Sequence, residues 1–216
     1  MNRPLRLMTA ALTASAALLL TACGSGGGDG GSSDKIEGAD DGGKPKASAS
    51  ASADAGSGGA KRPEIKLPDS FRMDFESWAN SDPKLQAILD DGKEQLRGDH
   101  AAIIDGDADA SYVNFYNSDA SLQGSRKWIK QYVDDDLTLV GKMRIFNPKV
   151  EINDSGAGVL FYCLDEGKAF TKDRKTGKKE GTPPGDNPHI LYRTMLHKSA
   201  DGVWKTTRSQ TERGGC

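Results

Sequence analysis

Metal-binding side chains are scarce in this sequence, which has three cysteines and three histidines among 216 residues. His189 and His197 lie eight residues apart on one predicted strand, about 25 Å from each other, so they cannot share a metal ion. The remaining histidine, His100, has no cysteine near it in the sequence. A zinc site needs several such ligands together, so we expect no metal and no other cofactor.

Signatures of common catalytic sites are also missing. The chain beyond residue 60 contains no Gly-x-Ser-x-Gly elbow, and no glycine-rich phosphate loop follows a predicted strand. Three aspartates at 105, 107 and 109 alternate as they do in calcium loops. However, Ala110 stands where such a loop needs glycine, and Tyr116 stands where it needs an acid. We interpret these aspartates as an acidic turn, and no motif predicts a catalytic residue.

Positive charge is not in excess, because the sequence has 29 Lys and Arg and 31 Asp and Glu, which gives a net charge of −2. Removal of residues 1–22, which hold Arg3 and Arg6 and no acid, would change this net charge of −2 to −4. A mildly acidic protein does not attract the phosphate backbone, so we expect no nucleic-acid partner.

No apolar run in the sequence has the length of a stable membrane-spanning helix. The run at 7–20 is rich in Ala and Leu, follows two arginines, and has the proportions of a secretory signal peptide. It leads into Leu-Thr-Ala-Cys at 20–23, the lipobox pattern, in which the cysteine receives a diacylglyceryl group. The sequence predicts a lipoprotein signal peptide over 1–22, lipidation of Cys23, and anchoring at the outer face of the cytoplasmic membrane. An ordinary signal peptide with a chance cysteine is the alternative.

A low-complexity segment follows the lipobox. Gly, Ser and Ala fill 26 of the 37 positions in residues 24–60, and Ile36 is the only large apolar residue among them. Such a segment cannot bury enough apolar surface to fold. We predict a disordered tether over 23–62 with a root-mean-square span of about 35 Å. A single domain then occupies 63–216.

Helices are predicted in the first half of this domain. Apolar residues recur at helical spacing over 83–105, and Asp82-Pro83 forms a good start. Gly92 and Gly98 weaken the pattern, and a division into two pieces is the alternative. Two more helices are expected, at 110–116 and at 119–135 with Asp119 as cap.

Strands are predicted in the second half. Apolar residues occupy odd positions over 137–145 and even positions after Asn147-Pro148. This change of parity indicates a bulge or a break between two strands. Further strands are expected at 157–163 and in a hairpin of 189–198 with 203–212, and a long polar loop is expected over 164–188. Helices followed by a meander of strands predict an α+β fold, with N-terminal helices packed on a curved antiparallel sheet of four to five strands.

Five segments resemble a group of actinobacterial secreted lipoproteins that have no assigned activity. They lie at 141–148, 160–166, 172–178, 202–207 and 212–214, within a resemblance that covers about 80–216. The order of elements is also similar to the nuclear transport factor 2-like fold, a cone of curved sheet covered by helices. That fold is used by isomerases, dehydratases and binding domains, so it does not imply one function.

Asp165 and Glu166 follow a predicted strand. In a cone fold such a carboxylate can act as a base beside a tyrosine, for which Tyr112, Tyr116 and Tyr162 are candidates. Exposed acids at the start of a loop are the favoured interpretation. The basic residues of 164–188 alternate with acids, which favours a solvated loop over a contact with anionic phospholipid. The three tryptophans are predicted to pack in or beside the core, at Trp78, Trp128 and Trp204.

Two functions are consistent with these patterns. We expect a non-enzymatic binding or interaction domain in the cell envelope, whose partner is an envelope protein or a small apolar ligand. The alternative is a cone-fold isomerase or dehydratase that uses one carboxylate base. A deep, partly apolar pocket with a buried Asp, Glu or His of shifted pKa would favour the enzyme.

Cys163 and Cys216 remain when Cys23 is assigned to lipid. An even pair in an oxidising compartment predicts a disulfide. If the last three predicted strands are successive antiparallel neighbours, both cysteines lie at the same edge of the sheet, two strand spacings or about 10 Å apart. Gly214 and Gly215 allow the tail to cross that gap. Two free thiols are the alternative.

Replacement of Cys23 by Ala should abolish lipidation, because the lipid is attached through the cysteine thiol. The variant is expected in the medium or as an uncleaved precursor. Metabolic labelling with an alkyne fatty acid checks this, and equal labelling of the wild type and of Cys23→Ala would contradict the prediction.

Overall fold

The computed structural model describes residues 60–216, so the predicted signal peptide, Cys23 and nearly all of the tether lie outside the described residues. No helix within 60–216 has both the length and the apolar character needed to cross a membrane. In chain order, the elements are β1 (Phe71–Phe75), α1 (Pro83–Asp105), α2 (Ser111–Tyr116), α3 (Asp119–Asp134), β2 (Leu137–Ile152), β3 (Gly158–Asp173), β4 (Lys179–Glu180), β5 (His189–Lys198) and β6 (Trp204–Arg213).

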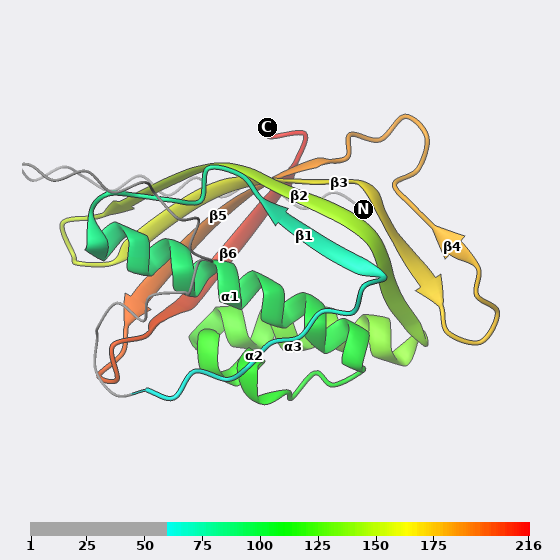
Figure 1. The fold of residues 1–216 in the computed structure, drawn as a ribbon, viewed down its shortest axis with the longest axis horizontal. Coiled ribbons are helices and arrows are strands. Elements are labelled where there is room, and N and C mark those ends of the chain that lie inside the picture. The colour runs from blue at the N-terminus through cyan, green and yellow to red at the C-terminus, as the bar shows by residue number, and fades with distance from the viewer. Residues whose placement is uncertain (1–59) are drawn as a thin grey trace, which may run out of the picture. The chain divides into compact units, whose positions relative to one another are not determined.

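The helices lie against one face of a curved sheet (Figure 1). The strand order is β1-β2-β3-β5-β6, and β4 pairs only with β3. All pairings are antiparallel except that of β1 with β2, in which Phe71 lies opposite Gly141. The predicted α+β fold, with helices packed on a curved sheet, is confirmed. The sheet is mixed rather than antiparallel, because the short strand β1, which was not predicted, pairs in parallel with β2.

Helix α1 is continuous, so the helix predicted over 83–105 is confirmed, and the alternative of two pieces divided at its glycines is wrong. Asp82 caps its start by accepting a hydrogen bond from the backbone N–H of Lys84 at 2.7 Å. A Cβ atom at Gly92 would lie 2.7 Å from the Leu160 side chain, and one at Gly98 would lie 3.2 Å from Tyr112. The two glycines therefore let the helix approach its neighbours closely, and packing offsets their low helix propensity.

Helix α3 begins one residue away from its predicted cap. Ser118 is the N-cap, and its backbone N–H donates to the Thr206 carbonyl of β6 at 2.9 Å. Asp119 is the first helical residue and has a φ of 50°. The contact with β6 fixes where the helix begins, which the sequence of the helix alone does not show.

Strand β2 is continuous, so of the two predicted alternatives, a bulge or a break, the structure has the bulge. Its register with β3 shifts between Phe146 and Lys149, and Asn147 has a φ of 52°. Pro148 lies in this segment and has no N–H to donate to the ladder. The change of parity at this point in the sequence is therefore a bulge rather than a break.

The predicted loop over 164–188 is wrong in its first half. Strand β3 continues to Asp173 and pairs with the start of β2, so that Leu137 lies opposite Asp173. The two residues of β4 also pair with this extension, and its residues beyond Leu164 are exposed or half-buried except Ala169, which joins the core. A polar sequence forms a strand here because its partner strand supplies the hydrogen bonds.

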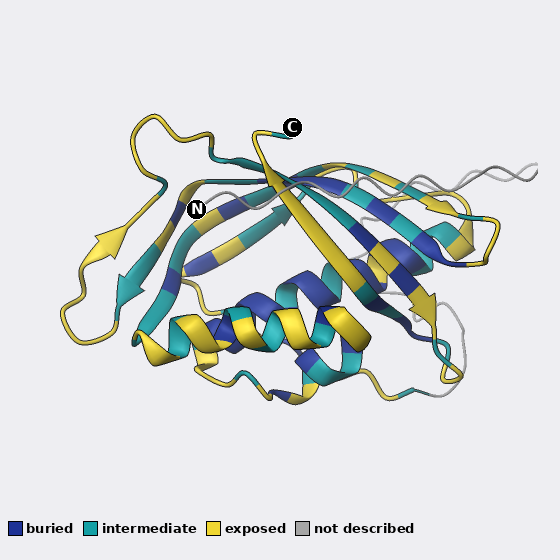
Figure 2. Cartoon of the chain, turned by 180° about the vertical axis from the view of Figure 1, so that it is seen from behind, coloured by how far each residue is buried: buried dark blue, intermediate teal, exposed yellow. Residues whose placement is uncertain are grey.

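The core lies between the helices and the concave face of the sheet (Figure 2). Trp204 is buried in it, while Trp78 and Trp128 are partly buried against it. The predicted packing role of the tryptophans is confirmed. The largest apolar side chains that are fully buried include Phe71, Ile88, Leu89, Ile103, Ile129, Ile145, Leu160, Leu164 and Leu196.

A buried carboxylate joins the start of the domain to the sheet. Asp91 of α1 is 1% exposed and accepts hydrogen bonds from the Arg62 guanidinium at 2.9 Å and from the Trp204 backbone N–H at 2.8 Å. Burial raises the pKa of Asp91, while these two hydrogen bonds oppose the shift. The ion pair connects a residue at the end of the predicted tether to α1.

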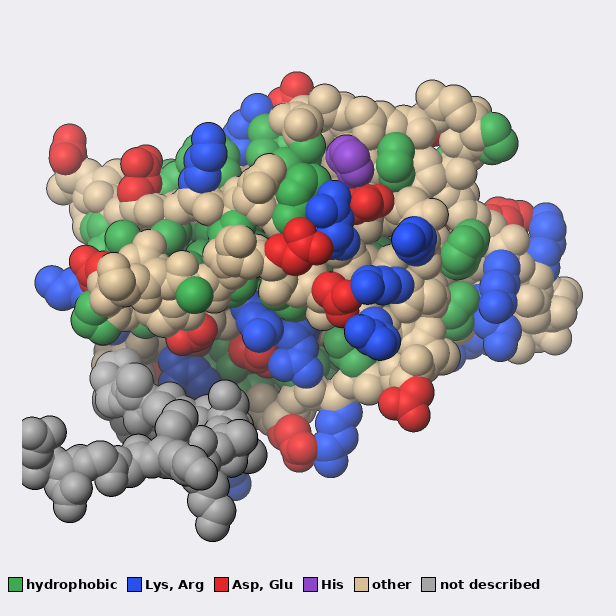
Figure 3. All heavy atoms as spheres, turned by 45° about the horizontal axis from the view of Figure 1, so that its top comes forward, with side chains coloured by type: hydrophobic (Ala, Val, Ile, Leu, Met, Phe, Trp, Pro, Cys, Tyr) green, Lys and Arg blue, Asp and Glu red, His purple; other side chains and the backbone are tan. Residues whose placement is uncertain are grey.

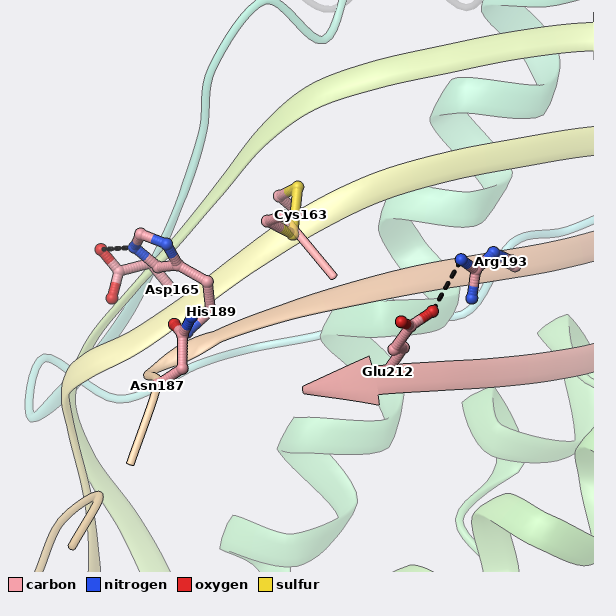
Figure 4. The surroundings of a disulfide bond; sticks show 7 residues. Cys163, Asp165, Asn187, His189, Arg193 and Glu212 are labelled. Carbon is pink, nitrogen blue, oxygen red and sulfur yellow. Dashed lines mark hydrogen bonds and ion pairs between the residues drawn. A yellow bond between two sulfur atoms is a disulfide. The ribbon is translucent and has the colours of Figure 1, made fainter. Parts of the chain in front are cut away.

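Cys163 and Cys216 form a disulfide on the outer face of the sheet (Figure 4), which confirms the prediction. Their Cα atoms are 6.1 Å apart. Gly214 turns the tail with a φ of 77°, and its backbone N–H donates to the His189 carbonyl at 2.8 Å. The C-terminus is thus attached to β3 across the intervening strand β5.

The disulfide should stabilise the domain, since it closes a loop with a sequence separation of 53 residues. The chain-entropy model predicts that Cys163→Ser with Cys216→Ser lowers the free energy of unfolding by up to about 4 kcal/mol. Urea unfolding measures this. Alkylation of the denatured wild type without reductant should add no label at either cysteine, and two labelled thiols in the intact mass would contradict the bond.

Candidate ligand-binding cavity

A cavity of about 410 Å³ lies between α1, α3 and the concave face of the sheet. This volume is within the range of small-molecule sites in proteins. Large apolar and aromatic side chains make up much of its wall, namely Leu96, Trp128, Tyr132, Leu139, Met143, Leu164, Ile190 and Tyr192.

The cavity opens between α3 and β6. Its exposed lining residues belong to these two elements, and they are Ala120, Gly124, Ser209, Thr211 and Arg213. A Cβ atom at Gly124 would meet no atom within 4 Å. The second half of β6 is exposed along its length (Figure 2). Small side chains on α3 therefore leave an entrance that a larger residue would close.

Asp99 of α1 lies deep in this cavity and is 5% exposed. Its carboxylate accepts hydrogen bonds from Ser125 Oγ at 2.5 Å, Gln95 Nε2 at 2.8 Å and Asn117 Nδ2 at 3.0 Å. Burial raises the pKa of Asp99 to about 7, although these three hydrogen bonds oppose the shift. The carboxyl group is therefore divided between its neutral and ionised forms near neutral pH.

His100 follows Asp99 and also lines the cavity. Its Nδ1 donates to the Leu96 carbonyl at 2.8 Å, because a carbonyl can only accept. The ring stacks on Phe71 and meets the edge of Trp128. Burial lowers the pKa of His100 to about 4, so the ring is neutral at pH 7 and Nε2 carries a lone pair.

An ion pair lies at the entrance of the cavity. Arg213 donates to Glu166 at 2.8 Å and to the Asn187 carbonyl at 2.7 Å. Glu166 also accepts a hydrogen bond from Thr182 Oγ1 at 3.1 Å. These contacts attach the loop before β5 and the end of β6 to the rim of the cavity.

The two acids proposed from sequence have different positions. Both lie within β3 rather than after it, and their side chains alternate between its faces. Glu166 reaches the cavity, whereas Asp165 faces the outer side with Arg144 at 3.8 Å and His189 at 3.5 Å (Figure 4). Asp165 is therefore remote from the cavity.

The tyrosines named from sequence are not those of the cavity. Tyr112 donates to Asp105 at 2.5 Å, Tyr116 packs in a separate cluster with Ile65, and Tyr162 lies in the core. Tyr132 and Tyr192 line the cavity instead. Burial and the charges of Glu166 and Asp99 raise the pKa of Tyr192.

Asp99 and His100 were missed as site residues because they occupy the middle of a helix and match no motif. One signal was present. Gln95 and Asp99 are polar residues four apart on a helix face that also holds Leu96 and Ile103. Polar groups at helical spacing on an apolar face indicate buried hydrogen-bonding groups.

The other charged groups singled out from sequence form no such site. Within 60–216, no cluster of three or more His, Cys, Asp or Glu is arranged to hold a metal ion. Lys175 pairs with Asp136 at 2.8 Å, and Lys178 pairs with Glu180 at 2.7 Å. Acidic and basic side chains are intermixed on the outer face of the sheet (Figure 3).

Asp99 should make the domain less stable as the pH rises. Its ordinary pKa is 3.8 and its pKa in the fold is about 7, so the folded state binds more protons between these values. The free energy of unfolding of the wild type, compared with that of Asp99→Asn, is highest below about pH 4. This advantage is lost as the pH rises through about 7. Between about pH 5 and about pH 7.5 it should fall by about 2–3 kcal/mol. Urea unfolding of both proteins at each pH tests this, and a difference that does not change with pH would contradict it.

Comparison with known proteins gives a likeness at the level of fold. No family model matches the chain, and no curated sequence matches it. Among solved structures, the intermembrane space region of the chloroplast protein ARC6 aligns with a TM-score of 0.45 at 11% identity, over 60% of this chain and 97% of that one. ActVI-ORFA from Streptomyces coelicolor aligns with a TM-score of 0.42 at 9% identity, over 60% and 96%. Aln2 from a Streptomyces species aligns with a TM-score of 0.42 at 14% identity, over 62% and 94%. At such identities the activities of these proteins are not transferred to this chain.

Proposed function

We propose that this protein is a lipid-anchored domain of the cell envelope that binds a small molecule with a largely apolar body. The observation that carries the proposal is the cavity of about 410 Å³, in which aromatic and aliphatic side chains form much of the wall and a polar group of Asp99, His100, Gln95 and Ser125 forms another part. Placed polar groups in a cavity with apolar walls are typical of sites that orient one ligand.

The cellular location belongs to the same proposal. It rests on the lipobox that ends at Cys23 and on the low-complexity segment that follows. Such an anchor would hold the domain at the outer face of the cytoplasmic membrane. An envelope protein is the alternative partner.

Binding is favoured over catalysis because the acids of the cavity are engaged by neighbouring side chains and His100 is a weak base. Both oxygens of Asp99 already accept hydrogen bonds, from Ser125, Gln95 and Asn117. His100 has its pKa lowered to about 4 by burial, so it is a weak base at neutral pH. Glu166 is held by Arg213.

A single-carboxylate isomerase or dehydratase is the second candidate function. One observation favours it, namely that Asp99 lies in the cavity with a pKa raised to about 7, which is a suitable value for proton transfer at neutral pH. Chromatography followed by mass spectrometry of a bound compound after incubation separates the two functions, because an isomer differs in retention time and a dehydrated product differs in mass. A binding domain returns the compound unchanged, and an enzyme returns an isomer or a dehydrated product.

The neutral apolar dye N-phenyl-1-naphthylamine should bind in the cavity and gain fluorescence, because the aromatic walls exclude water. Gly124→Trp should abolish the gain, since its side chain would extend into the empty space at the entrance. Gln123→Trp is the matched control, because Gln123 is exposed on the same helix and does not line the cavity.

The two tryptophan variants decide where the dye binds. Loss of the gain in Gly124→Trp alone supports the cavity. Equal gain in the wild type and in both variants would place the dye elsewhere and refute the proposed site. Thermal unfolding of the variants verifies that both remain folded.

A further inference from the structure

Asp99 lacks a cationic partner. Its contacts are an amide from Gln95, an amide from Asn117 and a hydroxyl from Ser125. None of the ion pairs formed within 60–216 includes it, and no nearby Lys or Arg lowers its pKa. The other buried carboxylate of α1, Asp91, is paired with Arg62. A buried carboxylate without a counter-charge is costly, so its presence in a cavity calls for an explanation.

The surroundings of Asp99 are arranged for a negative charge. The amides of Gln95 and Asn117 donate to it, and the Ser125 hydroxyl donates as well. Hydrogen bonds donated to a carboxylate favour its ionised form, and only burial acts in the opposite direction. A cation that entered the cavity would supply the missing counter-charge.

The rest of the cavity wall is also suited to a cation. The rings of Trp128, Tyr132 and Tyr192 contribute to it, and aromatic rings attract ammonium groups. Glu166 adds a second carboxylate at the entrance. Arg213 is the only Lys or Arg among the lining residues, and it is exposed and already bound to Glu166.

We infer that the ligand of this cavity carries a protonated amine or a quaternary ammonium group on its apolar body. The cationic group would lie among the aromatic rings within reach of the Asp99 carboxylate. This inference rests on the proposed function, because it names the chemical class of the ligand for the same cavity. A neutral ligand whose hydroxyl or carbonyl meets Asp99 is the competing outcome.

Three probes with the same phenylmethyl body and different head groups test the inference. Benzyltrimethylammonium carries a positive charge, neopentylbenzene has the same shape without charge, and phenylmethanesulfonate carries a negative charge. Their affinities for the purified mature protein are measured by displacement of N-phenyl-1-naphthylamine and, for the two soluble ions, by calorimetry. The cation should bind about tenfold more tightly than its neutral isostere, and the anion should bind most weakly.

Asp99→Asn should abolish the preference for the cation while the neutral probe still binds. Asp165→Asn is the matched control, because it removes a carboxylate from the same domain on the outer face of the sheet. It should leave the preference unchanged. If Asp99→Asn does not fold, Glu166→Gln at the accessible entrance serves as the second variant and should reduce the preference in part.

The outcomes separate the inference from the function on which it rests. A cation preference that depends on Asp99 or Glu166 supports both. Equal or tighter binding of the neutral probe overturns the cationic ligand and leaves the cavity as a binding site. If the preference for the cation is the same in Asp99→Asn and Glu166→Gln as in the wild type, the assignment of the cationic group to these carboxylates of the cavity is overturned. Failure of all three probes and of the dye overturns the inference together with the proposed function.

Discussion

The close approach of α1 to the sheet is the constraint on which the rest of the structure depends. At Gly92 the helix backbone comes so near to Leu160 that a Cβ atom would overlap its side chain. This contact fills one end of the concave face with core residues. Helix α3 is different, because a Cβ atom at Gly124 would meet nothing. Two glycines in two helices therefore have opposite roles, since one closes the core and the other leaves a cavity open.

Helix α1 also carries two buried carboxylates in different electrostatic settings. Asp91 has a guanidinium and a backbone N–H as partners, and its role is to join Arg62, the helix and Trp204. Asp99 has only neutral donors and faces the cavity. Since the cost of burying a charge is large, the first carboxylate is explained by the fold. The second is the carboxylate for which we propose a cationic ligand.

The outer face of the sheet is a different environment from the cavity. The disulfide, Asp165 and His189 lie there, and acidic and basic groups are intermixed across it (Figures 3 and 4). Alternation along β3 sends Asp165 outward and Glu166 inward, so adjacent acids of similar chemistry have unrelated surroundings. Only a strand that continues past Leu164 gives this separation, and a polar loop would not.

Local patterns were enough to predict the helices at 83–105, 110–116 and 119–135 to within a residue or two, an irregularity near Asn147, the last hairpin, and the cysteine pair. These features follow from local periodicity, from proline and glycine chemistry, and from counting cysteines. The course of β3 beyond Leu164, the addition of β1, and the gathering of Asp99, His100 and Glu166 around one cavity became clear only from the three-dimensional structure. These features depend on backbone pairing and burial between segments far apart in the chain, and the spacing of Gln95 and Asp99 on α1 does not show which segments surround them.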